Sequence, residues 1–568
     1  MTESLDTNVT SGKEASSANA ARSNWSLRSQ QTVVTACVLA CVVLISLYVR
    51  VSDYGFYEDD YWAIVPYFKT PFSQLWVNMV TEFHIWSQGR PLNHSIPMWF
   101  SRLGYGLGGV PGIYFLGFLV QFLNTFLAYL LLRKSVDLWS AVLGGCLLVL
   151  LPADTTHIFL EHSAQLHTSL SCLLIGLLLN RTRFWIVSYP IAALSLLSYE
   201  TAFLPFIVFP LFFFDRKGRV VRWVAHLAIC GAFLIAVLAT RLLLSDSRAT
   251  GVVSQPGDTL WRMISSLWIG PLTSLHTIAK AILEAPHSQT PFAFLFVALV
   301  LILLLAVPWL IRGTGNSAPA SAISRSRCFT LLFAGLTSWI FSYVLTIVNY
   351  PPLQLSGRLT STHLAAVFGL TCVFVAATSY FRCFHGLRVR AAATGTMSLL
   401  VAVFVLYSFH IQSGFAAAWA QERRFWRSVV QLCPDLTPNT RVIFVGNEPR
   451  QNQFILSNSW ADNLLLRQLF TWSPGPVFCY YSGTARIVDV RFENGQITWN
   501  PFWWGDKRET LNPDDLILLN GEGDEITRIN DLQIPELPFP LHSKQLAPSE
   551  PLPNPSPLSD FGRFLLKP

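Results

Sequence analysis

Charged side chains are scarce in this sequence. Only 13% of its 568 residues are Asp, Glu, Lys or Arg, whereas 52% are hydrophobic and the mean hydropathy is +0.42. A water-soluble protein of this length could not hide so large an apolar fraction in its core. The composition therefore excludes an ordinary soluble enzyme and predicts an α-helical protein that crosses a membrane many times.

The motifs of several functional classes are also missing. The sequence has no Walker-type GxxxxGK[ST] loop and no basic stretch interleaved with aromatic residues, which argues against nucleoside triphosphate chemistry and against a nucleic-acid partner. Its 10 Cys residues are scattered, without a CxxC pair or the spacing of a zinc finger. The net charge of +7 therefore reports membrane topology rather than nucleic-acid binding.

Apolar segments of suitable length recur along the first 410 residues and predict about eleven membrane spans. They lie at 32–49, 111–132, 138–152, 165–180, 184–198, 201–214, 223–244, 291–311, 328–347, 363–381 and 391–410. Lys13, Arg22 and Arg28 precede the first span, and alternate connections carry the later Arg and Lys residues. By the positive-inside rule the N-terminus is cytoplasmic, and an odd number of spans places the C-terminal region on the opposite side.

The domain organisation follows from these changes in composition. We expect a disordered cytoplasmic tail at 1–29, a transmembrane domain at 30–410 with outer loops at 51–110 and 245–290, an extracytoplasmic mixed α/β domain at 411–535, and a Pro-rich tail at 536–568 that is extended or disordered.

Two kinds of local pattern fill in this outline. In the first outer loop, Phe72, Leu75, Trp76 and Met79 share one helical face, which is typical of a helix lying in the membrane interface. In the C-terminal region the apolar runs shorten, and strands are predicted at 441–446, 486–490, 497–499 and 515–519, with Asn494-Gly495 as a hairpin turn.

Three consecutive carboxylates follow the first predicted span, in the stretch Tyr57-Glu58-Asp59-Asp60-Tyr61-Trp62. Placing acidic side chains at a membrane edge costs free energy unless water, a cation or a substrate interacts with them, so their presence there indicates function. A solvated acidic turn in front of an interfacial tryptophan is the plainer alternative.

Together with this topology, Tyr57-Glu58-Asp59-Asp60-Tyr61 and the downstream Gly89-Arg90-Pro91-Leu92 make the sequence resemble the GT-C class of membrane glycosyltransferases, which includes protein O-mannosyltransferases and lipid A aminoarabinose transferases. The resemblance covers roughly residues 30–410. It implies a donor sugar linked to a polyprenyl phosphate. The WWDYG-type motif of oligosaccharyltransferases is absent, so transfer to Asn is not expected.

The chemistry implied by this resemblance assigns roles to the acidic stretch. A phosphate leaves without protonation, so the enzyme needs one general base for the acceptor hydroxyl. We expect Asp59 to be that base, with Asp60 or Glu58 positioning the acceptor or a metal, and Tyr57 and Trp62 contacting substrate. A divalent cation is a conceivable cofactor, and no other cofactor is expected.

The departing phosphate calls for cations on the same side of the membrane. Outer basic residues are few, and Arg90, Arg358 and Arg241 are the candidates for contact with the lipid phosphate. Each could instead be a snorkelling anchor at the membrane surface.

Two further groups could line the same outer pocket. His157 and Glu161 are four residues apart, the spacing of one helical face, and are candidates for sugar binding or, more weakly, for a metal site. Glu200 lies between two closely joined spans, where it would recognise substrate or pair with an outer arginine.

The leading hypothesis is an integral membrane glycosyltransferase of a bacterial inner membrane that moves a sugar from a polyprenyl phosphate to an extracytoplasmic acceptor hydroxyl on lipid, glycan or protein, with inversion. A transporter or flippase of a lipid-linked saccharide is the first alternative, although such proteins place ionisable residues near the middle of the membrane in repeated halves. A noncatalytic membrane scaffold with an external binding domain is the second.

Overall fold

The computed structural model describes residues 30–214, 218–285, 291–312, 324–346, 357–446, 459–472, 475–481, 490–493, 496–499, 508–511, 515–522, 525–533, 539–545 and 558–567. The predicted disordered tail at 1–29 and the predicted turn at Asn494-Gly495 lie outside these residues, as does most of the predicted strand at 486–490.

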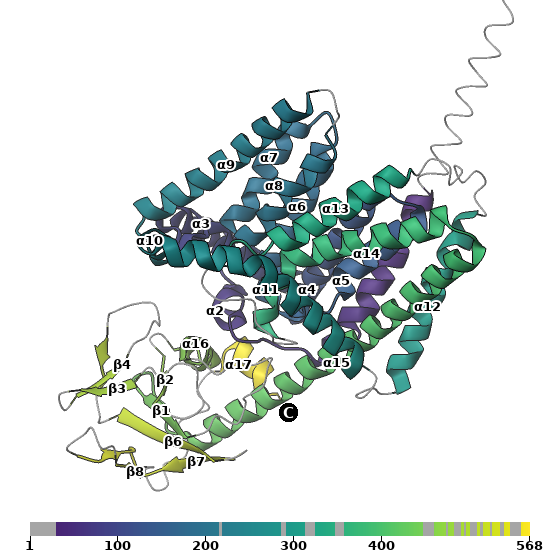
Figure 1. Ribbon diagram of the computed structural model, residues 1–568. Helices are drawn as coiled ribbons and strands as arrows, with labels where there is room; N and C mark the ends of the chain where they lie inside the picture. Colours follow the sequence, from purple (N-terminus) through teal and green to yellow (C-terminus); the bar gives the residue numbers. More distant parts are fainter. Residues whose placement is uncertain are drawn as a thin grey trace, which may run out of the picture.

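A large helical body forms most of the molecule (Figure 1). After the first helix, Gln30–Asp53, its α-helices are α2 (Asp60–Ala63), α3 (Phe72–Ile85), α4 (Pro91–Leu132), α5 (Leu138–Leu150), α6 (Leu160–Asn180), α7 (Trp185–Ala193), α8 (Leu204–Val208), α9 (Arg219–Leu243), α10 (Ser247–Ser254), α11 (Pro256–Glu284), α12 (Pro291–Arg312), α13 (Arg325–Phe341), α14 (Leu364–Phe384) and α15 (Leu387–Leu432). Short 3₁₀ turns join them at 51–53, 65–67, 87–89, 156–158, 194–197, 200–203, 209–212 and 358–363.

Six of the described helices are long and apolar enough to cross a membrane. They are Gln30–Asp53, Pro91–Leu132, Leu160–Asn180, Arg219–Leu243, Arg358–Cys383 and Leu387–Leu432. Shorter apolar helices lie at Leu138–Leu150, Trp185–Leu197, Glu200–Phe212 and Pro291–Ala306. The chain is thus a helical protein with several candidate membrane-spanning segments, and the larger number of eleven spans stays a prediction.

Helix α4 is interrupted where the sequence demands it. Gly108 and Gly109 leave the helical conformation, and Gly109 has φ +64°, a value that favours glycine. The two halves of α4 approach closely beside this break, because a Cβ on Gly112 would lie 2.2 Å from the carbonyl oxygen of Gly104. The break divides α4 into a part within the predicted first loop and a part that corresponds to the predicted span at 111–132.

The two segments that the sequence predicts as outer loops are largely helical. Helix α3 confirms the predicted helix in the first loop, and it leaves Phe72 and Trp76 exposed while Leu75 is buried. Exposed aromatic side chains on a short helix suit a position in a membrane interface. Most of the predicted loop at 245–290 is helical as well, in α10 and in α11, which follows α10 almost without interruption.

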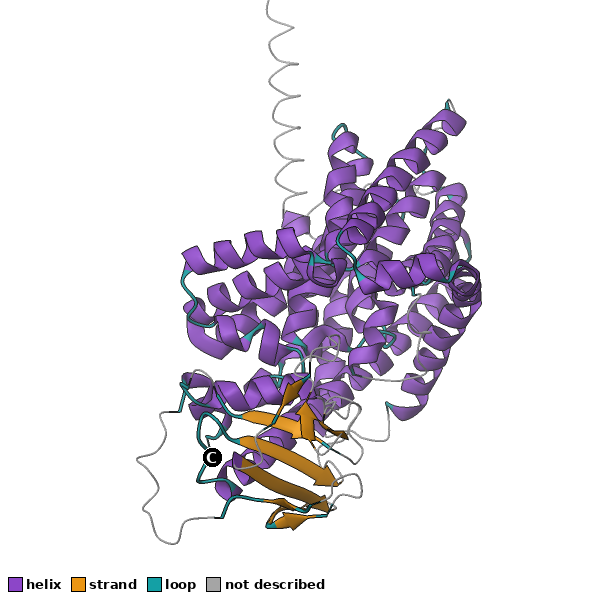
Figure 2. Ribbon diagram, turned by 90° about the vertical axis from the view of Figure 1, so that its left-hand side faces the viewer, coloured by secondary structure: helices purple, strands orange, loops and turns teal. Residues whose placement is uncertain are grey.

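The C-terminal region forms a small sheet domain beneath the helical body (Figure 2). Its elements are β1 (Arg441–Gly446), α16 (Ser459–Leu469), β2 (Val477–Tyr480), β3 (Val490–Glu493), β4 (Gln496–Trp499), β5 (Glu509–Thr510), β6 (Leu516–Glu522), β7 (Glu525–Ile529), β8 (Asp531–Leu532), β9 (Leu541–His542) and α17 (Asp560–Leu565). The main sheet has the order β2-β1-β6-β7, with β1 parallel to β2 and β6, and β7 antiparallel to β6. A smaller antiparallel sheet pairs β3, β4 and β5.

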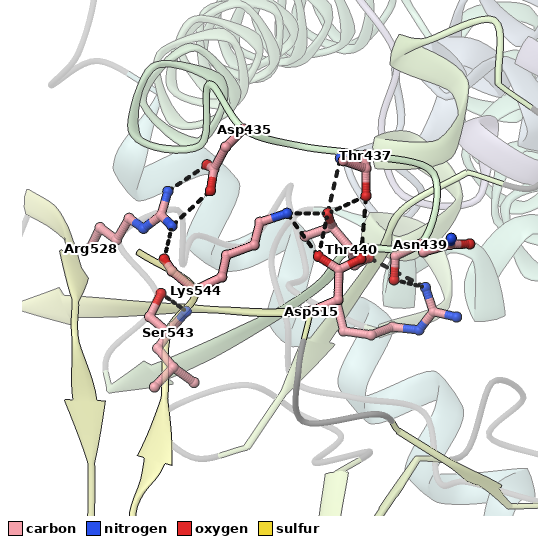
Figure 3. A network of polar contacts seen from close by, with 10 residues as sticks. Asp435, Thr437, Asn439, Thr440, Asp515, Arg528, Ser543 and Lys544 are labelled. Carbon is pink, nitrogen blue, oxygen red and sulfur yellow. Dashed lines mark hydrogen bonds and ion pairs between the residues drawn. The ribbon is translucent and has the colours of Figure 1, made fainter. Parts of the chain in front are cut away.

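Helix α15 connects the two parts without a break, so the boundary expected at 410/411 falls inside a helix. At its C-terminal end a polar network fixes the sheet domain (Figure 3). Arg528 of β7 donates two hydrogen bonds to Asp435, at 2.6 and 3.0 Å, and a third to the carbonyl oxygen of Leu432. Lys544 ties Thr440 to Asp515 in the same network. The sheet is thereby held to the end of α15.

The structure differs from the expected extended tail at 558–567. Ser559 caps α17 by accepting a hydrogen bond from the backbone N–H of Gly562. Phe561 and Phe564 of α17 pack against Phe56 of the first outer loop, with ring centroids 5.8 and 5.9 Å apart. The apolar residues of this segment, rather than its prolines, decide its conformation.

Candidate functional site

The acidic stretch forms a tight turn that separates the roles of its three carboxylates. The backbone N–H of Asp60 donates to the carbonyl oxygen of Tyr57, and the Asp60 carboxylate accepts in return from the backbone N–H of Tyr57 at 3.0 Å. Glu58, at the corner, has φ +45°, a conformation that costs a side chain-bearing residue about 1–3 kcal/mol. Such strain is typical of functional sites, and here it directs Glu58 and Asp59 to one side.

Arg358 lies against both of these carboxylates. Its Nη1 is 3.2 Å from Glu58 Oε2 and its Nη2 is 2.5 Å from Asp59 Oδ2. The side chains of Glu58 and Asp59 are 1% and 9% exposed, whereas 31% of the Arg358 side chain is open. The guanidinium therefore neutralises buried negative charge, while part of the Arg358 side chain stays open to solvent.

Asp60 is turned inward. It is fully buried, and its second carboxylate oxygen accepts from the backbone N–H of Glu161 at 2.8 Å. Burial raises the pKa of Asp60 to about 7, in spite of the two backbone hydrogen bonds that favour its ionised form. Because both oxygens are occupied by backbone donors, Asp60 joins the outer loop to the start of α6 and does not face the outside.

Both Tyr57 and Trp62 are expected from the sequence to contact substrate. The structure buries Tyr57 and leaves Trp62 partly exposed. Tyr57 is 1% exposed, and its hydroxyl donates to the carbonyl oxygen of Phe415 on α15. This position makes Tyr57 a packing residue of the turn. Trp62 is partly exposed and its ring lies 4.9 Å from that of His94 on α4.

Arg90 is presented by a strained loop between α3 and α4. Trp86, Gln88 and Gly89 all have positive φ, and Arg241 Nε donates to the carbonyl oxygen of Gly89 at 3.0 Å. A Cβ on Gly89 would lie 2.4 Å from Arg241 Nε, so only glycine allows this approach. The loop thus brings two of the predicted arginines together.

Glu200 pairs with these arginines, which answers the open question about its role. Arg90 Nε and Nη2 each donate to its carboxylate at 2.8 Å, a two-pronged geometry that fits guanidinium to carboxylate. Arg241 Nη1 is 3.7 Å from the same carboxylate. Arg248 of α10 lies nearby and donates to Gln88 Oε1, so the cluster carries three arginines.

The arginine cluster has spare binding capacity. Its carboxylates are Glu200 and Asp246, two negative charges against three positive ones. Arg241 Nη2 is buried and has no hydrogen-bond partner among the described residues. An anionic group would satisfy this donor and balance the charge. Sequence reasoning missed Arg248, although its place in an outer loop next to Arg241 was a usable signal.

His157 does not share a face with Glu161, contrary to the expectation from their spacing. His157 lies in the 3₁₀ turn at 156–158, and Phe159 is extended before α6 begins at Leu160. The helical spacing of four residues therefore does not apply across this segment. Instead, the ring of His157 lies 4.6 Å from that of His167, beside Asp154.

An apolar groove of about 470 Å³ runs along α4. Met79 of α3 and apolar side chains from both halves of α4 line it, from Leu92 to Leu123. The groove begins two residues after Arg90 and includes Ser95, the neighbour of His94, which contacts Trp62. Apolar and cationic surfaces thus adjoin the acidic turn.

No protein-family model matches this chain, and no curated protein matches it.

Proposed function

We propose that this protein is an integral membrane glycosyltransferase that moves a sugar from a polyprenyl-phosphate donor to an acceptor hydroxyl, with inversion at the sugar. The observation that carries the proposal is the pairing of Asp59 with the partly open Arg358. The loop that contains Asp59 continues to Arg90, a member of the arginine cluster, and then to the helix that lines the apolar groove. The polyprenyl tail and the phosphate of such a donor each find a surface of matching chemistry.

The apolar groove suits the polyprenyl tail. It is lined almost entirely by aliphatic and aromatic side chains and is formed in part by a helix long and apolar enough to span a membrane. A flexible isoprenoid placed there would gain hydrophobic contact without leaving the lipid phase. The end of the groove near Leu92 then directs the tail toward Arg90.

The arginines suit the phosphate. Arg90, Arg241 and Arg248 form a cluster with net positive charge, and Arg358 presents its open side near Asp59. Guanidinium groups bind phosphate oxygens with forked hydrogen bonds and stabilise the charge that develops as the sugar departs. We assign donor binding to this cluster and stabilisation of the leaving phosphate to Arg358.

Asp59 is the general base in this proposal. Asp60 is closed off by two backbone donors, and Glu58 is more deeply buried than Asp59. Asp59 is thus the carboxylate best able to accept the proton of an acceptor hydroxyl, while Arg358 holds it in place. Glu58 then serves to position Arg358.

The topology in this proposal has eleven spans, a cytoplasmic N-terminus and an extracytoplasmic sheet domain, in a bacterial inner membrane. Alkaline phosphatase and green fluorescent protein fusions after residues 135 and 545 test it. We expect fluorescence at 135 and phosphatase activity at 545, and the reverse pattern would refute the orientation.

A transfer assay tests the activity. Purified protein in liposomes receives a synthetic polyprenyl-phosphate hexose with a labelled sugar, together with an extract of envelope glycolipids and glycans as acceptors. We expect Asp59→Asn to reduce transfer at least 100-fold, because general-base catalysis contributes about 10²–10⁴-fold. Asp53→Asn is the matched control, since Asp53 lies in the same loop but is 48% exposed.

The outcomes separate the hypotheses. Full activity of Asp59→Asn would remove the base assignment. Movement of the labelled lipid between leaflets without sugar transfer would favour a flippase, and donor binding without either event would favour a scaffold.

A further inference from the structure

Three buried side chains converge behind the acidic turn. Asp154 follows α5, His157 lies in the 3₁₀ turn at 156–158, and His167 lies on α6. One potential ligand atom of each lies within 4.8 Å of those of the other two. Their exposed fractions are 3%, 6% and 1%, so the cluster is closed to bulk water.

Two atoms of this cluster are unsatisfied. Asp154 Oδ2 and His167 Nε2 are 3.7 Å apart, too far for a hydrogen bond, and neither has another partner among the described residues. Both residues line a cavity with about 10 Å³ of free space, which also contains Gln121 and Asn124. A buried carboxylate oxygen without a partner is costly, and a cavity of this size holds one ion or one water molecule.

We propose that Asp154, His157 and His167 bind one divalent transition-metal ion, with Zn²⁺ as the best-suited metal. Two imidazoles and one carboxylate are a common ligand set for such ions, and they leave a position open for water. A cation balances the buried carboxylate, which a water molecule does not.

Metal binding would require the three ligand atoms to move only slightly closer together. Three atoms at most 4.8 Å apart lie within about 2.8 Å of a common centre, since 4.8 divided by √3 is 2.8. Typical bonds from zinc to nitrogen and oxygen are about 2.0–2.2 Å, so each ligand would move inward by roughly 0.6–0.8 Å. Rotation of three side chains supplies such a movement.

This site would position Arg358. Thr155, between two residues of the cluster, accepts from the backbone N–H of Gly357 at 3.0 Å, and its own N–H donates to Thr360 Oγ1 at 3.0 Å. Gly357 and Thr360 flank Arg358 in the chain. A metal that fixes the turn at 154–157 therefore fixes the segment that carries the guanidinium. The metal site does not depend on the proposed transferase activity.

Metal content tests the site directly. Full-length protein is purified in detergent, equilibrated with Zn²⁺, passed through a desalting column and analysed by mass spectrometry for metal per chain. We expect about one equivalent in the wild type and less than a tenth in Asp154→Asn and His157→Gln. His226→Gln is the matched control, because His226 is 1% exposed on α9 and is bonded to Tyr189 instead of to the cluster.

A second measurement keeps the test decisive if these variants fold poorly. In the cobalt-substituted wild type we expect visible d–d absorption, and in His157→Cys, which retains a ligand, a new thiolate-to-cobalt charge-transfer band. We also expect Zn²⁺ to raise the melting temperature of the wild type and a chelator to reverse that rise. Less than a tenth of an equivalent in the wild type, a full equivalent in well-folded Asp154→Asn and His157→Gln, or no new band in cobalt-loaded His157→Cys would each overturn the proposal.

Discussion

Replacing Arg358 by Gln removes the positive charge that lies against Glu58 and Asp59. The change preserves much of the side-chain volume and some hydrogen-bonding capacity, but it leaves two carboxylates whose side chains are 1% and 9% exposed without this cation. We expect the variant to be clearly less stable than the wild type.

The size of the loss follows from burial. Removing one partner of a buried ion pair costs about 3–5 kcal/mol. Because 31% of the Arg358 side chain is open to solvent, screening places the expected loss near the lower limit, at about 3 kcal/mol. A loss of this size lowers the ratio of folded to unfolded protein by roughly 150-fold.

Thermal unfolding in one detergent, followed by the reaction of buried thiols with a fluorogenic dye, measures this effect. Cys146 and Cys372 are buried and report opening of the helical body, after the exposed thiols have been blocked. Arg388→Gln, at an exposed arginine of α15, is the matched control and should unfold like the wild type.

Charge removal supplies the decisive comparison. If uncompensated carboxylates cause the loss, adding Glu58→Gln and Asp59→Asn to Arg358→Gln should restore most of the stability. An unchanged unfolding temperature in the single variant would refute the reasoning. A triple variant no more stable than the single variant would refute it equally.

Three further predictions concern other parts of the molecule. Folding raises the pKa of Asp60 from 3.8 to about 7, so between these pH values the folded state holds a proton that the unfolded chain releases. The stability that this proton contributes is complete below about pH 4 and is lost as the pH rises through 7. Unfolding temperatures measured from pH 5 to 8 should therefore fall more steeply in the wild type than in Asp60→Asn, and parallel curves would contradict this. Gly369→Ala should lower the yield of folded protein, because a Cβ there would lie 2.4 Å from the backbone nitrogen of Trp339 and would push α13 from α14; size-exclusion chromatography checks this, with Gly395→Ala, at an open position of α15, as the control. Arg528→Ala should speed cleavage between α15 and the sheet domain in limited proteolysis, because it removes the bonds to Asp435, and an unchanged cleavage rate would argue against that role.

Sequence patterns predicted the presence of helices and strands better than the residues at which they begin and end. Apolar runs located the helices, and the run at 441–446 corresponds to β1. The apolar segment 391–410, however, continues in the structure as α15 to Leu432. Hydropathy reports where a helix would leave the lipid, whereas the helix itself ends only where its packing and hydrogen bonds end. The same difference explains why α4 starts at Pro91, twenty residues before its apolar segment.

The candidate site shows a comparable division. The predicted membrane topology has Glu58, Asp59 and Arg358 on one side, but no local pattern could pair residues 300 positions apart. The pairing of Glu200 with Arg90 was one of two possibilities that the sequence left open. The helical spacing of His157 and Glu161 was misleading, because a helix begins only at Leu160. Spacing arguments hold within an element and fail where the backbone changes direction.

The packing of Phe56 against Phe561 and Phe564 also has a consequence for the order of biosynthesis. These residues are 505 positions apart, so at about 5–20 residues per second the ribosome needs roughly 25–100 s to make the second surface after the first. During that interval the acidic turn has been synthesised, but the partners of Phe56 on α17 have not. The growing chain must therefore keep this apolar side chain soluble or lipid-bound until α17 is made. A change in α17 would then appear as a defect in maturation of a site about 500 residues earlier in the chain.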